Sequence, residues 1–150
     1  MDTFFEAIPK DKRYHVELRT EAYLSEPVFE ILEKHGVGLL YSHWTWLPPL
    51  LKQLSKTKER LFNSGGDCII RLMTPLRMSY EDSYAKAFSF NKMVDGMMNP
   101  EMIDDAIQTI MEGVRRRKRM NLIINNRAGG SAPMIARFIA KELGDQLRNI

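Results

Sequence analysis

The chain has 150 residues, 44% apolar and 27% charged, which is the balance of an ordinary globular protein. That length favours a single domain over residues 1–150. The net charge of +3, from 22 basic and 19 acidic residues, is too small to indicate nucleic-acid binding by itself. No apolar run approaches the roughly 20 residues of a membrane span, and the first residues are acidic, unlike a signal peptide. We therefore expect a cytoplasmic protein that does not bind a membrane.

Four short apolar segments, each followed by a helical stretch, repeat along the chain. Strands are predicted at Tyr14–Arg19, Val37–His43, Cys68–Met73 and Asn121–Asn125. This repetition predicts an α/β fold in which parallel strands have helices packed outside them. The second strand is almost entirely apolar, which is typical of a strand covered on both faces. In such folds the chemistry lies at the carboxyl ends of the strands.

Prolines, glycines and small polar residues mark the ends of the helices. Ser25 is the predicted cap of a helix that has Pro27 in its first turn and Gly36 at its end, and Pro100 opens a long helix. The predicted helices cover residues 3–8, 26–35, 50–62, 100–114 and 132–147.

A long excursion, Thr74–Asn99, separates the third strand from its helix. Tyr80, Tyr84 and Phe88 fall at helical spacing, so a short helix is predicted here. The excursion is either a small satellite core or a lid over the strand ends.

The single cysteine and the three histidines exclude the common metal frameworks. Cys68 lies inside an apolar strand, which predicts a small buried side chain, no disulfide and a reducing compartment. His15, His35 and His43 are scattered, without the spacing of zinc ligands. The chain also lacks a nucleotide-binding fingerprint, so we expect neither a metal nor a cofactor.

Charged residues alternate with apolar ones along the first strand. Because side chains alternate between the two faces of a strand, Glu17 and Arg19 point away from the outer helices that their apolar neighbours contact. Arg71, in the middle of the third strand, is predicted to share Glu17. The three residues are either an internal salt bridge that orders the fold, or a general acid or base beside two anion-binding arginines.

The second strand runs into an aromatic loop, Ser42–Pro49. His43 is either a proton donor or acceptor near neutral pH, or a hydrogen-bonded wall residue. Trp44 and Trp46 lie two residues apart. One is predicted to pack on the core, and the other to stack on a sugar or base.

The segment Asn125–Pro133 joins the last strand to the last helix. Two amides end the strand, two glycines permit a tight turn, and a serine is the expected helix cap. This pattern predicts unbonded backbone N–H groups and a helix dipole at the strand ends, which together form an anion pocket. The alternative is simply a capped helix after a glycine turn. The candidate ligand-binding residues here are Asn125, Asn126, Arg127, Gly130 and Ser131.

A basic run, Arg115–Arg119, follows the long helix. Cations at this end of a helix are favoured by its dipole, and the run lies on the strand-entry side, away from the predicted site. A solvated helix end is therefore the main interpretation. A nucleic-acid-associated module that uses this run and the tryptophans is the alternative.

Taken together, these segments resemble the YecE-like family, a domain of unknown function numbered seventy-two. The matching stretches are Tyr14–Arg19, Ser42–Pro49, Ile70–Leu72, Ala87–Asp95 and Asn125–Pro133. The resemblance implies an eight-stranded, TIM-barrel-like α/β fold, and no reaction is established for the family. Many members have a histidine and a glycine where this chain has Met73 and Thr74, so no histidine-dependent role is expected there.

Through this resemblance the chain corresponds to the carboxyl-terminal half of the barrel, four parallel βα units. A complete barrel needs about 250 residues, and four strands leave both edges of the sheet unpaired. Three interpretations follow. The chain is a fragment that lacks its amino-terminal half, a half barrel that pairs with a second copy as a homodimer, or an open sheet whose own termini cover its edges.

The leading functional hypothesis is a site for a small anionic molecule, a phosphate or carboxylate compound, at the strand ends. Arg19, Arg71 and the Asn126–Ser131 loop would bind it. Glu17 would act as acid or base with His43 assisting, in a hydrolysis or an isomerisation. The alternatives are the nucleic-acid-associated module and an inactive half of a longer barrel.

Overall fold

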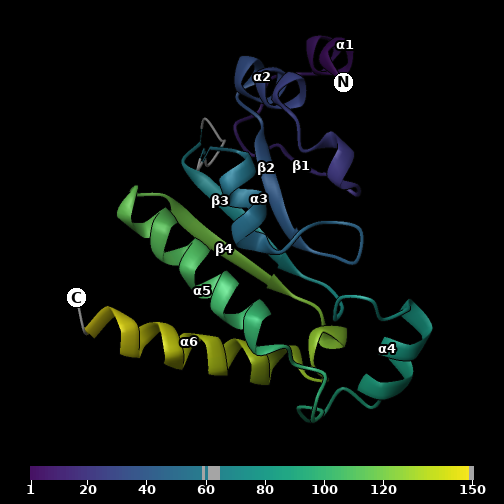
Figure 1. The fold of residues 1–150 in the computed structure, drawn as a ribbon. Coiled ribbons are helices and arrows are strands. Elements are labelled where there is room, and N and C mark those ends of the chain that lie inside the picture. The colour runs from purple at the N-terminus through teal and green to yellow at the C-terminus, as the bar shows by residue number, and fades with distance from the viewer. Residues whose placement is uncertain (59, 61–64, 149–150) are drawn as a thin grey trace.

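The computed structural model describes residues 1–58, 60 and 65–148. Its strands are β1 (His15–Glu17), β2 (Gly38–His43), β3 (Asp67–Leu72) and β4 (Arg119–Ile124). They form one sheet in the order β1-β2-β3-β4, and every neighbouring pair is parallel (Figure 1). The predicted α/β fold with four parallel strands is therefore confirmed.

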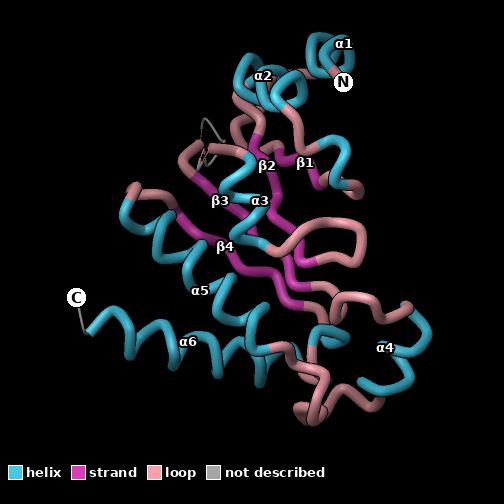
Figure 2. Tube along the Cα trace, in the orientation of Figure 1, coloured by secondary structure: helices cyan, strands magenta, loops and turns pink. Residues whose placement is uncertain are grey.

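Helices connect the strands, as Figure 2 shows. A crossover of this kind returns the chain to the same end of the sheet, which parallel pairing requires. None of the described helices is both long enough and apolar enough to cross a membrane. The helices are α1 (Asp2–Ala7), α2 (Glu26–His35), α3 (Leu50–Lys56), α4 (Tyr80–Ala87), α5 (Pro100–Arg115) and α6 (Ala132–Arg148), with the 3-10 turns η1 (Glu21–Tyr23) and η2 (Asn126–Ala128).

Gly36 and Pro100 mark the end of α2 and the start of α5 as predicted, whereas the predicted cap, Ser25, makes no side-chain hydrogen bond at the start of α2. Gly36 follows α2 with a φ of 64°, a left-handed conformation that glycine adopts at little cost, and its N–H donates back to carbonyls of the last turn. α5 begins at Pro100, and Asn99 Oδ1 accepts the N–H of Glu101 at 2.9 Å.

Three elements differ from the predicted ranges by two residues or more at one end. The helix expected to reach residue 62 ends at Lys56, because Lys58 has a φ of 51°, in the left-handed region, and breaks the helical path. Phe62 itself lies outside the described residues. β1 is limited to His15–Glu17, and β4 starts two residues early, where the Arg119 guanidinium binds the carboxylate of Asp67 at 2.8 Å.

The sheet has a covered face and an open face. Tyr41 and Ile70 are fully buried in the core beneath the helices, with α3 against β2 and α5 against β3 and β4 (Figure 1). On the opposite face, Leu40 and Ile69 are half-buried and Ile123 is 48% exposed. This open face carries the side chains that alternate with the core residues. No described helix packs over them.

Cys68 of β3 is 1% exposed and unpaired, in agreement with the predicted buried thiol. Burial raises the pKa of this thiol to about 12. Cys68 therefore behaves as a small apolar core residue rather than as a nucleophile.

Candidate functional site

Three side chains converge on the carboxylate of Glu17, at the carboxyl end of β1. Arg71 Nη1 lies 2.9 Å from Oε2, and Arg19 Nη2 lies 3.0 Å from the same oxygen. The hydroxyl of Ser42 donates to Oε1. The Glu17 side chain is only 15% exposed. The predicted sharing of Glu17 by two arginines is therefore present, and we call these four residues the Glu17 cluster.

The parallel register brings the Glu17 cluster together. Glu17 is aligned with Leu40, and Leu40 with Ile69. Ser42 and Arg71 lie two residues further along their strands, so they share this face and stand one step closer to the carboxyl end. One carboxylate and two guanidinium groups give the cluster a net charge of +1, which favours an anionic ligand.

The buried Gln53 of α3 fixes the end of β2. Its Nε2 donates to the carbonyl oxygens of Ser42 and Pro48, both at 2.7 Å, and its Oε1 accepts the N–H of Ser42 at 3.3 Å. A buried amide needs such partners, and here they join the two ends of the aromatic loop. The sequence analysis did not select Ser42 or Gln53 as site residues. The alternation of β2 was a signal for Ser42, whereas nothing in the sequence indicates the role of Gln53.

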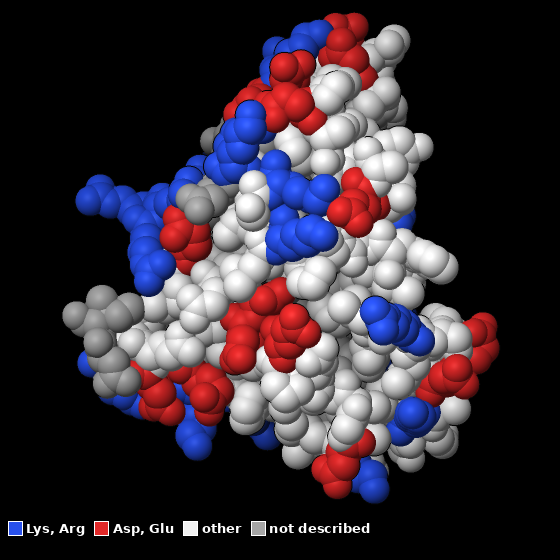
Figure 3. Space-filling model, viewed as in Figure 1, with Lys and Arg blue, Asp and Glu red and all other residues white. Residues whose placement is uncertain are grey.

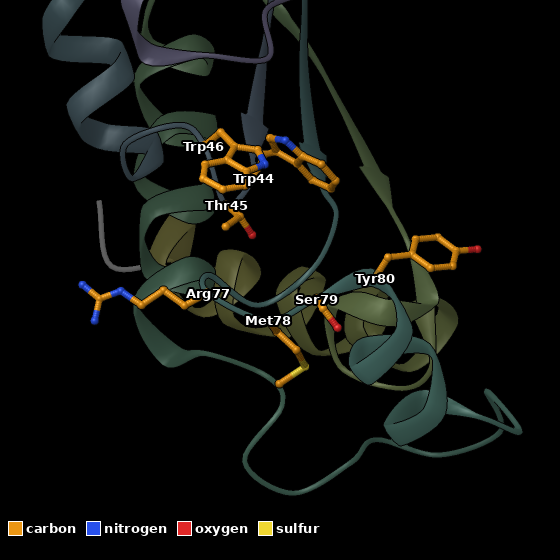
Figure 4. A pocket seen from close by; sticks show the side chains of 7 residues that line it. All are labelled: Trp44, Thr45, Trp46, Arg77, Met78, Ser79 and Tyr80. Atoms are coloured by element: carbon orange, nitrogen blue, oxygen red, sulfur yellow. The ribbon is translucent and has the colours of Figure 1, made fainter.

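A hollow of about 630 Å³ opens between the aromatic loop and the segment that leads into α4 (Figure 4). Its volume lies within the range of small-ligand sites. Trp44 packs partly on the core, as predicted for one of the two tryptophans, while Trp46 is 69% exposed. The Arg19 guanidinium lies 5.1 Å from the Trp44 ring, which connects the Glu17 cluster to the hollow. The lining residues are Trp44, Thr45, Trp46, Arg77, Met78, Ser79 and Tyr80.

His43 lies at the end of β2 but on the covered face, opposite to its neighbour Ser42. It is 2% exposed, and its Nδ1 lies 3.1 Å from the carbonyl oxygen of Thr74. Burial lowers the pKa of the imidazole to about 4, so the ring is neutral at pH 7. Because a carbonyl only accepts, Nδ1 carries the proton. The structure does not bring His43 and Glu17 to the same face.

The loop between β4 and α6 uses its backbone amides internally. Asn125 Oδ1 accepts the N–H of Arg127 at 3.0 Å. Asn126 accepts three hydrogen bonds: its Oδ1 takes the N–H of Ala132 at 2.8 Å, and its carbonyl takes the N–H groups of Gly129 and Gly130 at 3.3 and 2.6 Å. The expectation that these N–H groups are unbonded is wrong, because the two asparagines accept them.

The glycine turn of this loop has a packing reason. Gly130 has a φ of 103°, and a Cβ there would lie 2.3 Å from the carbonyl oxygen of Lys92. The carbonyl of Gly129 accepts the N–H of Val94 at 2.9 Å. The glycine turn therefore packs closely against residues 92–94 of the excursion. Ser131, the residue before α6, is 5% exposed, and its carbonyl oxygen accepts the N–H of Ile135 at 3.0 Å.

Arg127 lacks a carboxylate partner among the described residues. Its guanidinium carbon lies 4.0 Å from the ring centre of Tyr80 in α4. Its Nε is buried without a hydrogen-bond acceptor. The sequence analysis selects Arg127 but does not predict its contact with Tyr80. The spacing of Tyr80, Tyr84 and Phe88 predicts only the helix α4.

A family model described as "Protein of unknown function DUF72" matches residues 1–150. The chain belongs to the DUF72 family. The resemblance to the YecE-like family is thereby confirmed. Comparisons with curated proteins and with solved structures found no match.

In this DUF72 protein the excursion forms α4, as predicted. Tyr80, Tyr84 and Phe88 stack along the helix, with ring centroids 6.3 and 6.2 Å apart, and all three are exposed. The inward side of α4 carries Ser83 and Ala87 instead. The three aromatic residues therefore do not form a satellite core, but Ala87 and Met97 of the excursion are buried outside the main core, so the satellite core and the lid both stay predictions.

The basic run of the DUF72 protein lies at the opposite end of the strands from the Glu17 cluster. Arg115 and Arg116 pair with Glu112 at 3.5 and 2.5 Å, and Arg119 pairs with Asp67 at 2.8 Å. Figure 3 shows basic side chains gathered at the end of α5 with acidic ones beside them. Such pairing is typical of a solvated helix end.

One group of potential metal ligands lies near the amino terminus. Asp2, Glu6 and His35 place ligand atoms within 4.8 Å of one another. Lys34 Nζ already lies 2.9 Å from Asp2 and 3.0 Å from Glu6. Hydrogen bonds from His35 and Lys34 lower the pKa of Asp2. Lys34 therefore already bridges the two carboxylates and offsets one of their two negative charges, and we assign no metal to this group.

Proposed function

We propose that this DUF72 protein binds a small anionic molecule, a phosphate or carboxylate compound, at the carboxyl ends of β1 to β3. The Glu17 cluster carries the proposal, because its net charge is +1 and Arg19 links it to a hollow of ligand size. Guanidinium groups suit such ligands because they donate several N–H bonds in a planar fork.

Arg71 is the inner anchor of the proposed site and Arg19 the outer one, with side chains 31% and 52% exposed. Arg127 supplies a third cation from the loop after β4. Trp44 and Trp46 would flank a ring or an apolar part of the ligand. The other predicted loop residues would hold Arg127 in place: Asn125, Asn126, Gly130 and Ser131.

Glu17 is the group that would move a proton. Both of its oxygens are bonded, one to Ser42 and the other to the two arginines. An anionic ligand competes for those arginines, which leaves Glu17 Oε2 beside the bound molecule. A carboxylate next to an anchored anion suits hydrolysis or isomerisation. His43 is not used in this scheme, because it is neutral and lies on the covered face.

We further infer that the four strands are half of a TIM-barrel-like sheet. Their sequential order, their parallel pairing and the helices on one face support this inference. The Glu17 cluster would then lie inside the barrel at the carboxyl end of the strands, where such folds hold their sites.

Ligand binding is tested by thermal unfolding with millimolar inorganic phosphate or sugar phosphates. A site occupied at about 100 times its Kd gains about 2.7 kcal/mol, which is about 9 °C in Tm for a chain of this size. Arg71→Ala is expected to abolish this shift while its circular dichroism spectrum is unchanged. Arg119→Ala is the matched control, because it also removes an arginine paired with a carboxylate, but at the amino end of β4, away from the Glu17 cluster.

Two results would contradict the proposal: no shift with any of these ligands, or an equal loss of the shift in both variants. A third result would reassign the cluster. If Arg71→Ala or Glu17→Gln unfolds the chain, the Glu17 cluster is a structural ion network rather than a binding site.

A further inference from the structure

The open face carries apolar side chains between two charged groups, and the described residues leave it uncovered. Leu40 and Ile69 are half-buried there and Ile123 is 48% exposed, whereas Tyr41 and Ile70 on the covered face are fully buried. A second hollow of about 630 Å³ lies on this side and is lined in part by Ile69 and Ile123. Parallel sheets are normally covered on both faces. The open face therefore requires a partner.

Both edges of the sheet are also unpaired among the described residues. β1 and β4 are the outermost strands, and each has a neighbour on one side only. An edge strand presents a row of backbone N–H and C=O groups that attracts another strand. β4 has six residues and no proline, and the charge of Arg119 is already matched by Asp67. Nothing in β4 blocks such pairing.

We infer that the partner is a second copy of this chain, placed so that β4 of each copy pairs with β1 of the other. All four strands run in one direction. A twofold axis parallel to the strands preserves that direction and puts each β1 beside the partner's β4. Both seams form together, and both open faces become interior. A partner that satisfied only one edge would leave the other edge exposed.

The charges of the open face are compatible with this arrangement. Asp67 and Arg119 neutralise each other at the amino end of the strands. At the carboxyl end each Glu17 cluster carries +1, from one carboxylate and two arginines. Two copies therefore bring +2 to a shared, solvent-accessible mouth, where an anion would offset it. Each copy supplies the facing wall that the other copy's cluster lacks.

The oligomeric state of the full chain is the test. Sedimentation velocity at micromolar concentration is expected to give a mass about twice 17.4 kDa. Ile123→Asp places a charge on the open face and is expected to give monomers. Val114→Asp is the matched control, because Val114 is 46% exposed on α5, outside the sheet, and this variant is expected to remain dimeric.

Wild-type chain that sediments as a monomer would overturn the inference. So would a dimer that survives Ile123→Asp but dissociates in Val114→Asp. A measurement without any variant guards against misfolding of Ile123→Asp. The Tm of a dimer rises with protein concentration, so a Tm that is constant over about a hundredfold dilution also counts against the second copy.

Discussion

Acidification is expected to destabilise the fold through His43. Its ring is 2% exposed, and burial lowers its pKa from 6.5 to about 4. The same ring in the unfolded chain binds a proton near its ordinary pKa, so below about pH 6.5 the unfolded state holds more protons. The stability due to the neutral ring is complete above the unfolded pKa and is lost as the pH falls. At about 1.36 kcal/mol per pKa unit, the loss is about 2 kcal/mol by pH 5 and about 3 kcal/mol by pH 4.

Urea unfolding of the wild type and of His43→Gln, followed by far-ultraviolet circular dichroism at pH 7, 6 and 5, measures this contribution. Glutamine keeps an N–H donor for the Thr74 carbonyl but does not titrate. Carboxylates with a lowered pKa, such as Asp11 and Asp67, are common to both proteins and cancel in the difference. The wild type is expected to lose about 2 kcal/mol more than the variant between pH 7 and 5. Parallel losses in the two proteins would refute the reasoning.

Other substitutions test the packing. Gly130→Ala is expected to lower the free energy of unfolding by about 2 kcal/mol or more, because Gly130 has a φ of 103° and the Lys92 carbonyl faces it. Gly144→Ala, at an open position in α6, is expected to raise the free energy of unfolding by about 0.5–1 kcal/mol. Urea unfolding measures both changes. Asp105→Ala is expected to lower the free energy of unfolding by about 1 kcal/mol in the same assay, because Asp105 Oδ2 accepts the N–H of Leu51 at the start of α3, at 3.3 Å. Asp105→Asn, which keeps an oxygen acceptor, is the control. Cys68 is expected to react with a thiol reagent at about pH 8 only after unfolding, because burial raises its pKa to about 12.

The order and type of the elements follow from the sequence, because apolar residues recur within each element at the spacing of a strand or of a helix. The boundaries depend on contacts that no period encodes. β4 starts early because Arg119 reaches Asp67 on the neighbouring strand, 52 residues away in sequence. α3 ends early because Lys58 adopts a positive φ, which its residue type does not indicate. Local patterns therefore predict which element forms, and tertiary contacts set where it stops.

The Glu17 cluster was predictable in part for the same reason. Alternation places Glu17 and Arg71 on one face, and the parallel register then brings them within 2.9 Å. The same rule applied to β2 selects Ser42 and excludes His43, its neighbour on the other face. Alternation does not predict the hydrogen bonding of the loop after β4. Whether its amides are unbonded depends on the rotamers of Asn125 and Asn126, which the sequence does not specify.

Dimer formation is expected to strengthen anion binding, because it removes water from the open face. In the single chain the Arg71 and Arg19 side chains are 31% and 52% exposed, so solvent weakens their attraction for an anion. A second copy that covers the open face removes part of that water and strengthens every charge interaction at the shared mouth. Phosphate would then bind the dimer more tightly than the Ile123→Asp monomer, and by linkage it would favour the dimer. Equal phosphate affinity in the two states would preserve the ligand site but show that the second copy contributes no wall to it.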